Sequence, residues 1–345
     1  MQRALCLIVL ALGVLADTKL AACSGLPTVP LYAQFGDWLI ACDNGRRCEA
    51  RGLGPGRAEI DIRRDAGDAP VVLTLAVRQT PPPASVKIGD QPIGLPAPDW
   101  TTQVDEDVSK MTTTVPGQVA AFLDHAKTVK TLKFPSGDTA PLDGLATALR
   151  RMDVVQGREG TPTALIAAKG GSQPIPPAPP LPPRPLWQPI APLADGEAGP
   201  LIAAAKRRAA NAMKSSGDCD YVERDEAHAL SASQALVTLS CPVNAYQGET
   251  FVFIVPRQGG APVPFDTRLP VLDVIDEKLG DVTFDGKTGT LTNRSRGAGL
   301  ANCGWNAAWV WSTGAFRLAS LTYQRACGGT SIDDWPSLFR TAPSH

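Results

Sequence analysis

The stretch DWLIACDNGRRC, residues 37–48, predicts a β-hairpin at the start of the globular part of the chain. Four apolar residues lead to Cys42, and Asn44-Gly45 is typical of a tight turn. Five residues separate Cys42 from Cys48, and a loop of odd length places its two flanking residues opposite each other. A cross-strand disulfide needs that placement. The stretch therefore indicates antiparallel β structure closed by a disulfide.

The residues that follow extend this structure into a mixed domain. EIDIRR (59–64) and PVVLTLAV (70–77) predict an antiparallel pair of strands. Further on, Pro116 begins a helical pattern, and Asp143 is placed to cap a second one. The apolar faces of these helices are Val119, Phe122, Leu123 and Ala126, and Leu145, Leu149 and Met152. The first half is expected to be α+β.

The second half is also expected to be α+β, with more strands than the first. A helix is predicted with Pro200 in its first turn, and its apolar stripe is Leu201, Ala205, Ala209 and Met213. Six strand-like segments follow, of which Phe251 to Val255 is apolar on both faces and is therefore expected at the centre of a sheet. The sequence thus predicts two mainly antiparallel-β domains, each with one or two helices.

A proline-rich segment separates the halves. Eleven prolines lie between Gly170 and Pro200, and their fixed φ angles and missing N–H groups favour polyproline II over helix or central strand. Fully stretched, residues 174–192 would span roughly 55 to 60 Å. We expect a semi-rigid linker at 169–200 that holds apart domains at 32–168 and 201–345.

The N-terminus has the pattern of an export signal. One arginine precedes an apolar run of thirteen residues, Ala4 to Ala16, which is too short to span a bilayer. Two processing sites compete. The Leu20-Ala21-Ala22-Cys23 stretch is similar to a bacterial lipobox, so that 1–23 would contain the signal and a lipidated Cys23 would begin the mature chain. Alternatively, cleavage after Ala16 leaves Asp17 first.

The cysteine count favours the lipidated Cys23. Of eight cysteines, Cys6 is lost with the signal, and lipidation of Cys23 leaves an even number in an oxidising compartment. Pairing of sequence neighbours has the lowest loop-closure cost. The expected disulfides are Cys42–Cys48, Cys219–Cys241 and Cys303–Cys327. The expected location is the periplasm-facing envelope, as an outer-membrane lipoprotein, with a soluble periplasmic or secreted protein as the alternative.

Catalytic motifs are missing from the sequence. There is no serine-hydrolase elbow, zinc-protease motif or phosphate-binding loop, and only three histidines are present. We therefore expect no cofactor, no metal and no catalytic residue. With 33 basic and 34 acidic residues, nothing favours nucleic acid as a partner, and no second apolar run suggests a membrane span.

Two function classes remain open. The first is a non-catalytic envelope module that binds a protein or a surface polymer, with a lipid anchor in the membrane. The alternative is a hydrolase of envelope polymers that uses carboxylates such as Asp218 and Asp220 as acid and base. The absence of a paired nucleophile and base favours the first class.

Two groups of residues are candidate binding sites. Trp305, Trp309 and Trp311 share one face of a regular strand, where they could stack on sugar rings or pack in the core. Arginines cluster near the first hairpin and could contact phosphates of lipids or polymers, or be ordinary solvated side chains. These arginines are Arg46, Arg47, Arg51 and Arg57.

Several blocks together carry a family resemblance. They are FGDWLIACDNGRRCEARGL (35–53), PLDGLATALRRMDVVQGR (141–158), GDCDY (217–221), and the closing segments from RGAGLANCGWNAAWVW (296–311) to WPSLFRT (335–341). In this order they resemble the domain of unknown function 1176 family of bacterial envelope proteins. The first half is also weakly similar to invasion-associated locus B proteins. The resemblance implies an exported two-domain protein and supplies no activity.

Overall fold

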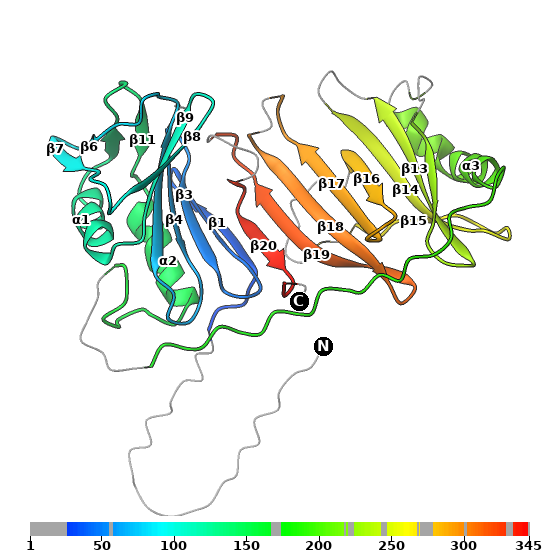
Figure 1. The fold of residues 1–345 in the computed structure, drawn as a ribbon, viewed down its shortest axis with the longest axis horizontal. Coiled ribbons are helices and arrows are strands. Elements are labelled where there is room, and N and C mark those ends of the chain that lie inside the picture. Colours follow the sequence, from blue (N-terminus) through cyan, green and yellow to red (C-terminus); the bar gives the residue numbers. More distant parts are fainter. Residues whose placement is uncertain are drawn as a thin grey trace, which may run out of the picture.

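The computed structural model describes residues 26–54, 58–166, 174–216, 219, 224–242, 247–267, 269, 279–299, 302–328 and 334–343. Within these residues the chain forms four antiparallel sheets and three helices (Figure 1). The predicted α+β class, with mainly antiparallel strands, is confirmed.

A seven-stranded sheet, the N-terminal sheet, organises the first half. Its strands are, in spatial order, β1 (Leu31–Phe35), β2 (Trp38–Cys42), β3 (Cys48–Gly52), β4 (Ala58–Arg64), β5 (Val71–Val77), β9 (Val108–Thr113) and β8 (Thr101–Asp105). The opening hairpin is β2–β3, in which Cys42 pairs in register with Cys48. Its disulfide is formed, as predicted.

A second sheet and two helices cover one face of the N-terminal sheet. The small sheet consists of β11 (Thr139–Pro141), β10 (Thr131–Lys133), β6 (Ser85–Ile88) and β7 (Gln91–Gly94), and the helices are α1 (Pro116–Ala126) and α2 (Leu145–Val155). Residues such as Ile60, Leu75 and Phe122 are fully buried between these layers. Both predicted apolar helix faces are buried.

The cap predicted for α2 is wrong. Gly144, with φ 97°, is the N-cap residue, and no side chain caps the helix. A Cβ at Gly144 would lie 1.8 Å from the carbonyl oxygen of Phe35, so only glycine fits there. Asp143 instead accepts a hydrogen bond from the Asp37 N–H through its backbone oxygen, at 3.2 Å.

The second half contains two further sheets and one helix. One sheet comprises β12 (Glu226–Ala229), β13 (Gln234–Pro242), β14 (Gly248–Pro256) and β15 (Val263–Pro264), and α3 (Ala198–Ser216) covers its outer face. The C-terminal sheet comprises β16 (Asp281–Asp285), β17 (Thr290–Arg296), β18 (Gly304–Ser312), β19 (Ala315–Gln324) and β20 (Ser337–Arg340). As predicted, Phe251 to Val255 lies in a central strand, β14.

The two halves share a hydrophobic core. Leu39, Ala41 and Leu53 of the first half belong to the same buried cluster as Trp305 and Leu338 of the second. Polar contacts cross the same boundary: Asp43 forms an ion pair with Arg340, and the Tyr32 hydroxyl accepts a hydrogen bond from the Arg325 N–H at 3.0 Å. The two halves are therefore packed directly together. The expectation that a spacer holds them apart is corrected.

The proline-rich segment, residues 174–192, runs as an extended strap along both halves (Figure 1). We call it the Pro-rich strap. The Ala342 N–H donates to the Pro182 carbonyl at 2.8 Å, and the Trp187 indole N–H donates to the Gly286 carbonyl at 3.2 Å. Trp187 also packs edge-on against Phe284, with ring centroids 6.4 Å apart. The segment braces a contact that the shared core already makes.

All three predicted disulfides are formed. They are Cys42–Cys48, Cys219–Cys241 and Cys303–Cys327. The last joins the chain just before β18 to the chain just after β19, so it closes the hairpin formed by these two strands. None of the helices in the described part of the chain has the length and apolarity that a bilayer crossing requires.

Candidate functional site

A polar cavity of about 280 Å³ lies where the outer face of the N-terminal sheet meets the edge of the C-terminal sheet. Four cationic and four carboxylate side chains line it, together with hydroxyls and one indole. The lining residues are Arg47, Glu49, Arg51, Glu59, Asp61, Arg63, Thr74, Ala76, Lys110, Thr322, Asp334, Trp335 and Ser337.

Strand alternation places these charges on one face. In β4, Ile60 and Ile62 point into the helix-covered core, so Glu59, Asp61 and Arg63 point to the opposite face. Neighbouring strands follow the same alternation. Across the sheet Arg51 of β3 is paired in register with Asp61, Asp61 with Thr74 of β5, and Ala76 with Lys110 of β9. Side chains at such cross-strand positions are neighbours.

Arg51 is the centre of the cluster. Its side chain is 3% exposed, and its Nη2 atom lies 2.6 Å from a Glu49 carboxylate oxygen and 3.3 Å from one of Asp61. Its Nε atom lies 3.3 Å from a Glu59 carboxylate oxygen. Three carboxylates therefore surround one buried guanidinium. Buried charges of this kind are tolerated only when they are paired.

The environment of this cluster shifts the pKa of Asp61. Burial, and next the neighbouring carboxylate of Glu49, raise the pKa of Asp61 well above its usual range. Arg51 acts in the opposite direction but does not cancel the rise. Burial in this cluster therefore favours the protonated form of Asp61. In the described ranges, no group of three or more histidine, cysteine or acidic side chains is arranged to hold a metal ion.

The second half contributes the other wall. The Arg51 Nη1 atom donates to the side-chain oxygen of Gln324 at 3.0 Å, and Nη2 donates to the backbone carbonyl of Asp334. Lys110 forms an ion pair with the Asp334 carboxylate. Next to it, Trp335 is 4% exposed, and its indole N–H makes no hydrogen bond within the described residues. Residues from both ends of the chain thus complete one site.

Arg63 differs from the other cations of the cavity. Arg51 and Lys110 are paired as described, and Arg47 lies 3.4 Å from Asp65. Among the residues that the structure describes, no side-chain hydrogen bond or ion pair involves the Arg63 guanidinium. A partly buried guanidinium without a partner is available to a negatively charged ligand group.

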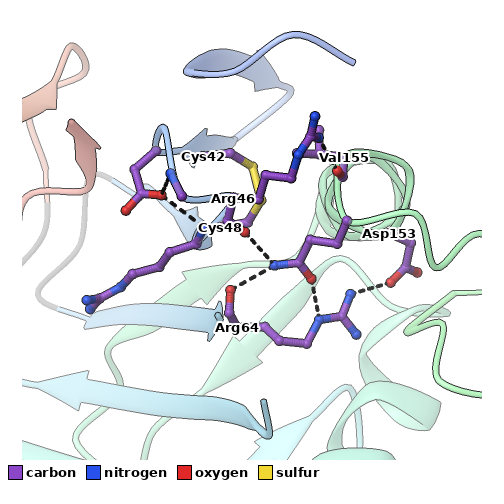
Figure 2. Close-up of a disulfide and its surroundings, with 10 residues drawn as sticks. Cys42, Arg46, Cys48, Arg64, Asp153 and Val155 are labelled. Atoms are coloured by element: carbon purple, nitrogen blue, oxygen red, sulfur yellow. Dashed lines mark hydrogen bonds and ion pairs between the residues drawn. A yellow bond between two sulfur atoms is a disulfide. The ribbon is translucent and has the colours of Figure 1, made fainter. Parts of the chain in front are cut away.

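A second buried network lies on the other face of β4 and is structural (Figure 2). The Arg64 Nη2 atom donates to Asp153 and its Nε atom donates to Gln156, both at 2.6 Å. Burial lowers the pKa of Arg64 to about 10, so the side chain remains charged at neutral pH. This pairing fixes the end of α2 against the sheet behind the first disulfide.

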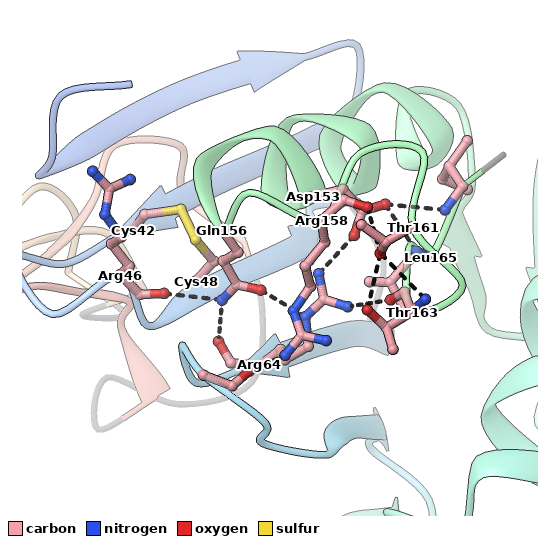
Figure 3. A network of polar contacts seen from close by, with 12 residues as sticks. Cys42, Arg46, Cys48, Arg64, Asp153, Gln156, Arg158, Thr161, Thr163 and Leu165 are labelled. Atoms are coloured by element: carbon pink, nitrogen blue, oxygen red, sulfur yellow. Dashed lines mark hydrogen bonds and ion pairs between the residues drawn. A yellow bond between two sulfur atoms is a disulfide. The ribbon is translucent and has the colours of Figure 1, made fainter. Parts of the chain in front are cut away.

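The same network extends to the turn and to the loop after α2 (Figure 3). The Gln156 amide donates to the Arg46 carbonyl at 2.9 Å, and the second Asp153 oxygen accepts from the Leu165 N–H at 2.8 Å. The Arg46 guanidinium donates to the Val155 carbonyl at 2.6 Å. Every member therefore has protein partners, and the network offers little to a ligand.

The structure places the sequence-predicted site residues in different environments. Trp305, Trp309 and Trp311 are at most 5% exposed and pack in the shared core, so their ring faces are covered by protein. Arg46 bonds to the end of α2, whereas Arg47 lines the cavity. Arg57, and the proposed acid and base Asp218 and Asp220, lie outside the described residues.

Sequence reasoning missed the most important members of the site. Arg51 was named among arginines that could contact phosphates or be solvated, without its buried carboxylate partners, and Glu59, Asp61 and Arg63 were assigned only to a strand. A signal was present in EIDIRR, where charged residues alternate with isoleucine. The alternation identifies a charged outer face. It does not indicate that another part of the chain covers that face.

Comparisons with known proteins identify relatives without an assigned activity. The model of the family described as protein of unknown function (DUF1176) matches residues 32–342. The uncharacterized protein YpfG of Escherichia coli (strain K12) is 29% identical over 333 residues, which cover 90% of this chain and 93% of that protein. No solved structure matches the chain significantly. These matches give no support to the weaker similarity to invasion-associated locus B proteins.

Proposed function

We propose that this chain, which belongs to the DUF1176 family of proteins of unknown function, is an exported binding protein whose ligand site is the cavity between its halves. The observation that carries the proposal is Arg63, a cavity-lining guanidinium without a protein partner among the described residues. It lies on the same strand face as Asp61, whose pKa is raised chiefly by burial and next by the neighbouring Glu49 carboxylate.

The ligand class follows from these two residues. An anionic group, such as a carboxylate or phosphate, would pair with Arg63, because guanidinium forms strong charge-assisted hydrogen bonds with such groups. An ammonium group of the same ligand would supply positive charge beside Asp61 and Glu49. The cavity volume of about 280 Å³ is at the small end of ligand pockets. We therefore propose a small zwitterion, of the size of an amino acid or dipeptide.

A binding role accounts for the lining better than catalysis does. The described lining residues supply hydroxyls on Thr74, Thr322 and Ser337 but include neither histidine nor cysteine. A nucleophile needs a base within hydrogen-bond reach, and no contact joins these hydroxyls to the carboxylates among the described residues. The alternative, a polymer hydrolase, depends on Asp218 and Asp220, which the structure does not describe.

Titration of purified protein with zwitterions tests the ligand class. A panel of amino acids, dipeptides and amino sugars is measured by calorimetry, with matched ligands that carry only the acid or only the amine. We expect a zwitterion to bind, and we expect Arg63→Gln to weaken its affinity at least tenfold. Arg317→Gln, which removes an exposed arginine outside the cavity, should leave binding unchanged. Equal binding by wild type and Arg63→Gln would place the ligand elsewhere.

Export and lipid anchoring are part of the same proposal. The three disulfides support an oxidising compartment, and Cys23 is proposed as the lipidated N-terminus, although it lies outside the described residues. Acyl labelling and membrane fractionation test this. Cys23→Ser should abolish labelling and release the protein from the outer-membrane fraction. Unlabelled wild-type protein that begins at Asp17 would show cleavage after Ala16 instead.

A further inference from the structure

The Pro-rich strap has a three-residue pattern of exposure. From Pro174 to Pro192, every third residue is exposed to solvent. Six of these seven residues are prolines, and the remaining one is Leu186. We call these seven residues the exposed ridge. Up to Trp187 the residues between them are partly buried, apart from Ala178 and Arg184, whereas residues 188–192 are all exposed. The three-residue pattern therefore describes the strap from Pro174 to Trp187.

Polyproline II geometry explains the pattern. This helix has three residues per turn, so residues at i and i+3 lie on one edge. The strap has neither helix nor strand hydrogen bonding, and it runs extended past both halves (Figure 1). The exposed ridge is therefore one continuous apolar edge that faces solvent.

The opposite side of the strap is held by the protein. Pro176 packs so closely on Gly157 that a Cβ there would lie 2.8 Å from its ring, and Leu181 approaches Gly45 in the same way, at 2.7 Å. Near the other end, the Trp187 ring lies over Gly289, where a Cβ would be 2.3 Å from it. These contacts fix the strap in place from Pro176 to Trp187. The exposed ridge is thus ordered before any partner binds.

Bracing alone does not account for the outer edge. A brace needs only the side that contacts the two halves, yet Leu186 is 81% exposed on the outer edge and is the most exposed large hydrophobic residue in the described chain. Arg184 is also exposed, two residues before it. Along the ridge, Leu186 lies between Pro183 and Pro189, with a cation nearby. Grooves that bind proline-rich segments recognise this combination of side chains.

We propose that the exposed ridge is a docking site for a partner protein whose groove is lined by aromatic rings. Such grooves pack parallel aromatic side chains against successive proline turns, and a preformed polyproline helix loses little entropy on binding. An acidic side chain at the rim of the groove would pair with Arg184. This interaction is separate from the ligand cavity, because none of the ridge residues lines it.

Site-specific photo-crosslinking in producing cells tests the proposal. A photoreactive amino acid is placed at position 186 in the full-length protein, and at exposed Lys287 on the β16–β17 turn as the matched control site. Protein adducts of the envelope fraction are identified by mass spectrometry. The captured partner is then purified and titrated with the full-length protein while its own tryptophan or tyrosine fluorescence is followed.

Three results together are expected. An adduct forms at position 186 and not at 287, a synthetic peptide of residues 174–192 competes for the purified partner, and the double variant Pro180→Ala, Pro183→Ala weakens binding at least tenfold. The control Gln188→Ala, at an exposed position outside the ridge, changes binding less than twofold. Thermal unfolding checks that both variants stay folded. No adduct at 186 above that at 287, an adduct to a polysaccharide, or binding unaffected by the double variant would overturn the proposal.

Discussion

The buried guanidinium of Arg51 donates a hydrogen bond to the backbone carbonyl of Asp334, a residue 283 positions further along the chain. The same guanidinium is surrounded by Glu49, Glu59 and Asp61 of its own sheet. One side chain therefore neutralises the acidic cluster and fixes the segment that leads into β20. This couples the charge balance of the cavity to the contact between the halves.

We predict that Arg51→Gln is strongly destabilising. The substitution leaves three carboxylates close together and buried without their central cation, and such a loss costs about 3 to 5 kcal/mol. It also removes the hydrogen bond to the Asp334 carbonyl. Chemical denaturation with tryptophan fluorescence gives the free energy of unfolding directly.

Arg63→Gln is the matched control for this experiment. Arg63 lies on the neighbouring strand and lines the same cavity, but it has no protein partner among the described residues. The free energy of unfolding should therefore change by no more than about 0.5 kcal/mol. Equal losses of unfolding free energy in both variants would contradict the structural role of Arg51. They would show instead that any loss of positive charge from the cavity is destabilising.

We predict that Asp61 makes the stability of the protein depend on pH. Its pKa is raised in the folded state, chiefly by burial, so the folded protein holds this proton more tightly than the unfolded chain. Asp61 therefore lowers the free energy of unfolding as the pH rises from about 4, the ordinary pKa of aspartate, through the raised value. Asp61→Asn cannot lose a proton, so the difference in stability between variant and wild type should shift in favour of the variant from pH 4 to pH 7.

Denaturation at several pH values measures this difference. Asp65→Asn, at a more exposed aspartate whose side chain is 52% accessible, is the control and should show a nearly constant difference from wild type. A constant difference for Asp61→Asn as well would mean that Arg51 keeps Asp61 ionised throughout and outweighs the effect of burial.

Local features of this protein could be predicted from its sequence, and long-range ones could not. The Cys42–Cys48 hairpin and the face of α1 depend on neighbours within a few residues, and both are found as predicted. The cap of α2 was mispredicted because a close approach of the Phe35 carbonyl selects Gly144, and that approach is a tertiary contact. No residue spacing reports such a contact.

The cavity escaped prediction for the same reason. Charged residues that alternate with isoleucine in β4 have the pattern of a solvated sheet face, and only the packing of β20 against the sheet turns this face into a cavity wall. The Pro-rich strap was correctly predicted to be extended. Its composition could not show that Trp187 and Leu181 have sites on the two halves.

We predict that Trp187 is an anchor of the strap. Its ring packs against Phe284 and over Gly289, and its N–H is bonded to the Gly286 carbonyl. Trp187→Ala should lower the free energy of unfolding by about 2 kcal/mol, since the ring is only partly buried. Leu186→Ala removes the adjacent exposed side chain and should change stability by less than about 0.5 kcal/mol. If Leu186→Ala lowered the free energy of unfolding as much as Trp187→Ala, the Trp187 side chain would not be an anchor of the strap.

We finally predict that the halves stay associated after the strap is cut. A specific protease site inserted between Gln188 and Pro189 lies in an exposed part of the strap beyond the Trp187 anchor. After cleavage, the shared core around Leu39 and Trp305 and the ion pair between Asp43 and Arg340 remain available to hold the fragments. Size-exclusion chromatography should therefore show both fragments in one peak at the elution volume of the uncut protein, and they should separate only in denaturant. Two separate folded fragments in native buffer would instead restore the interpretation of the segment as a spacer between independent domains.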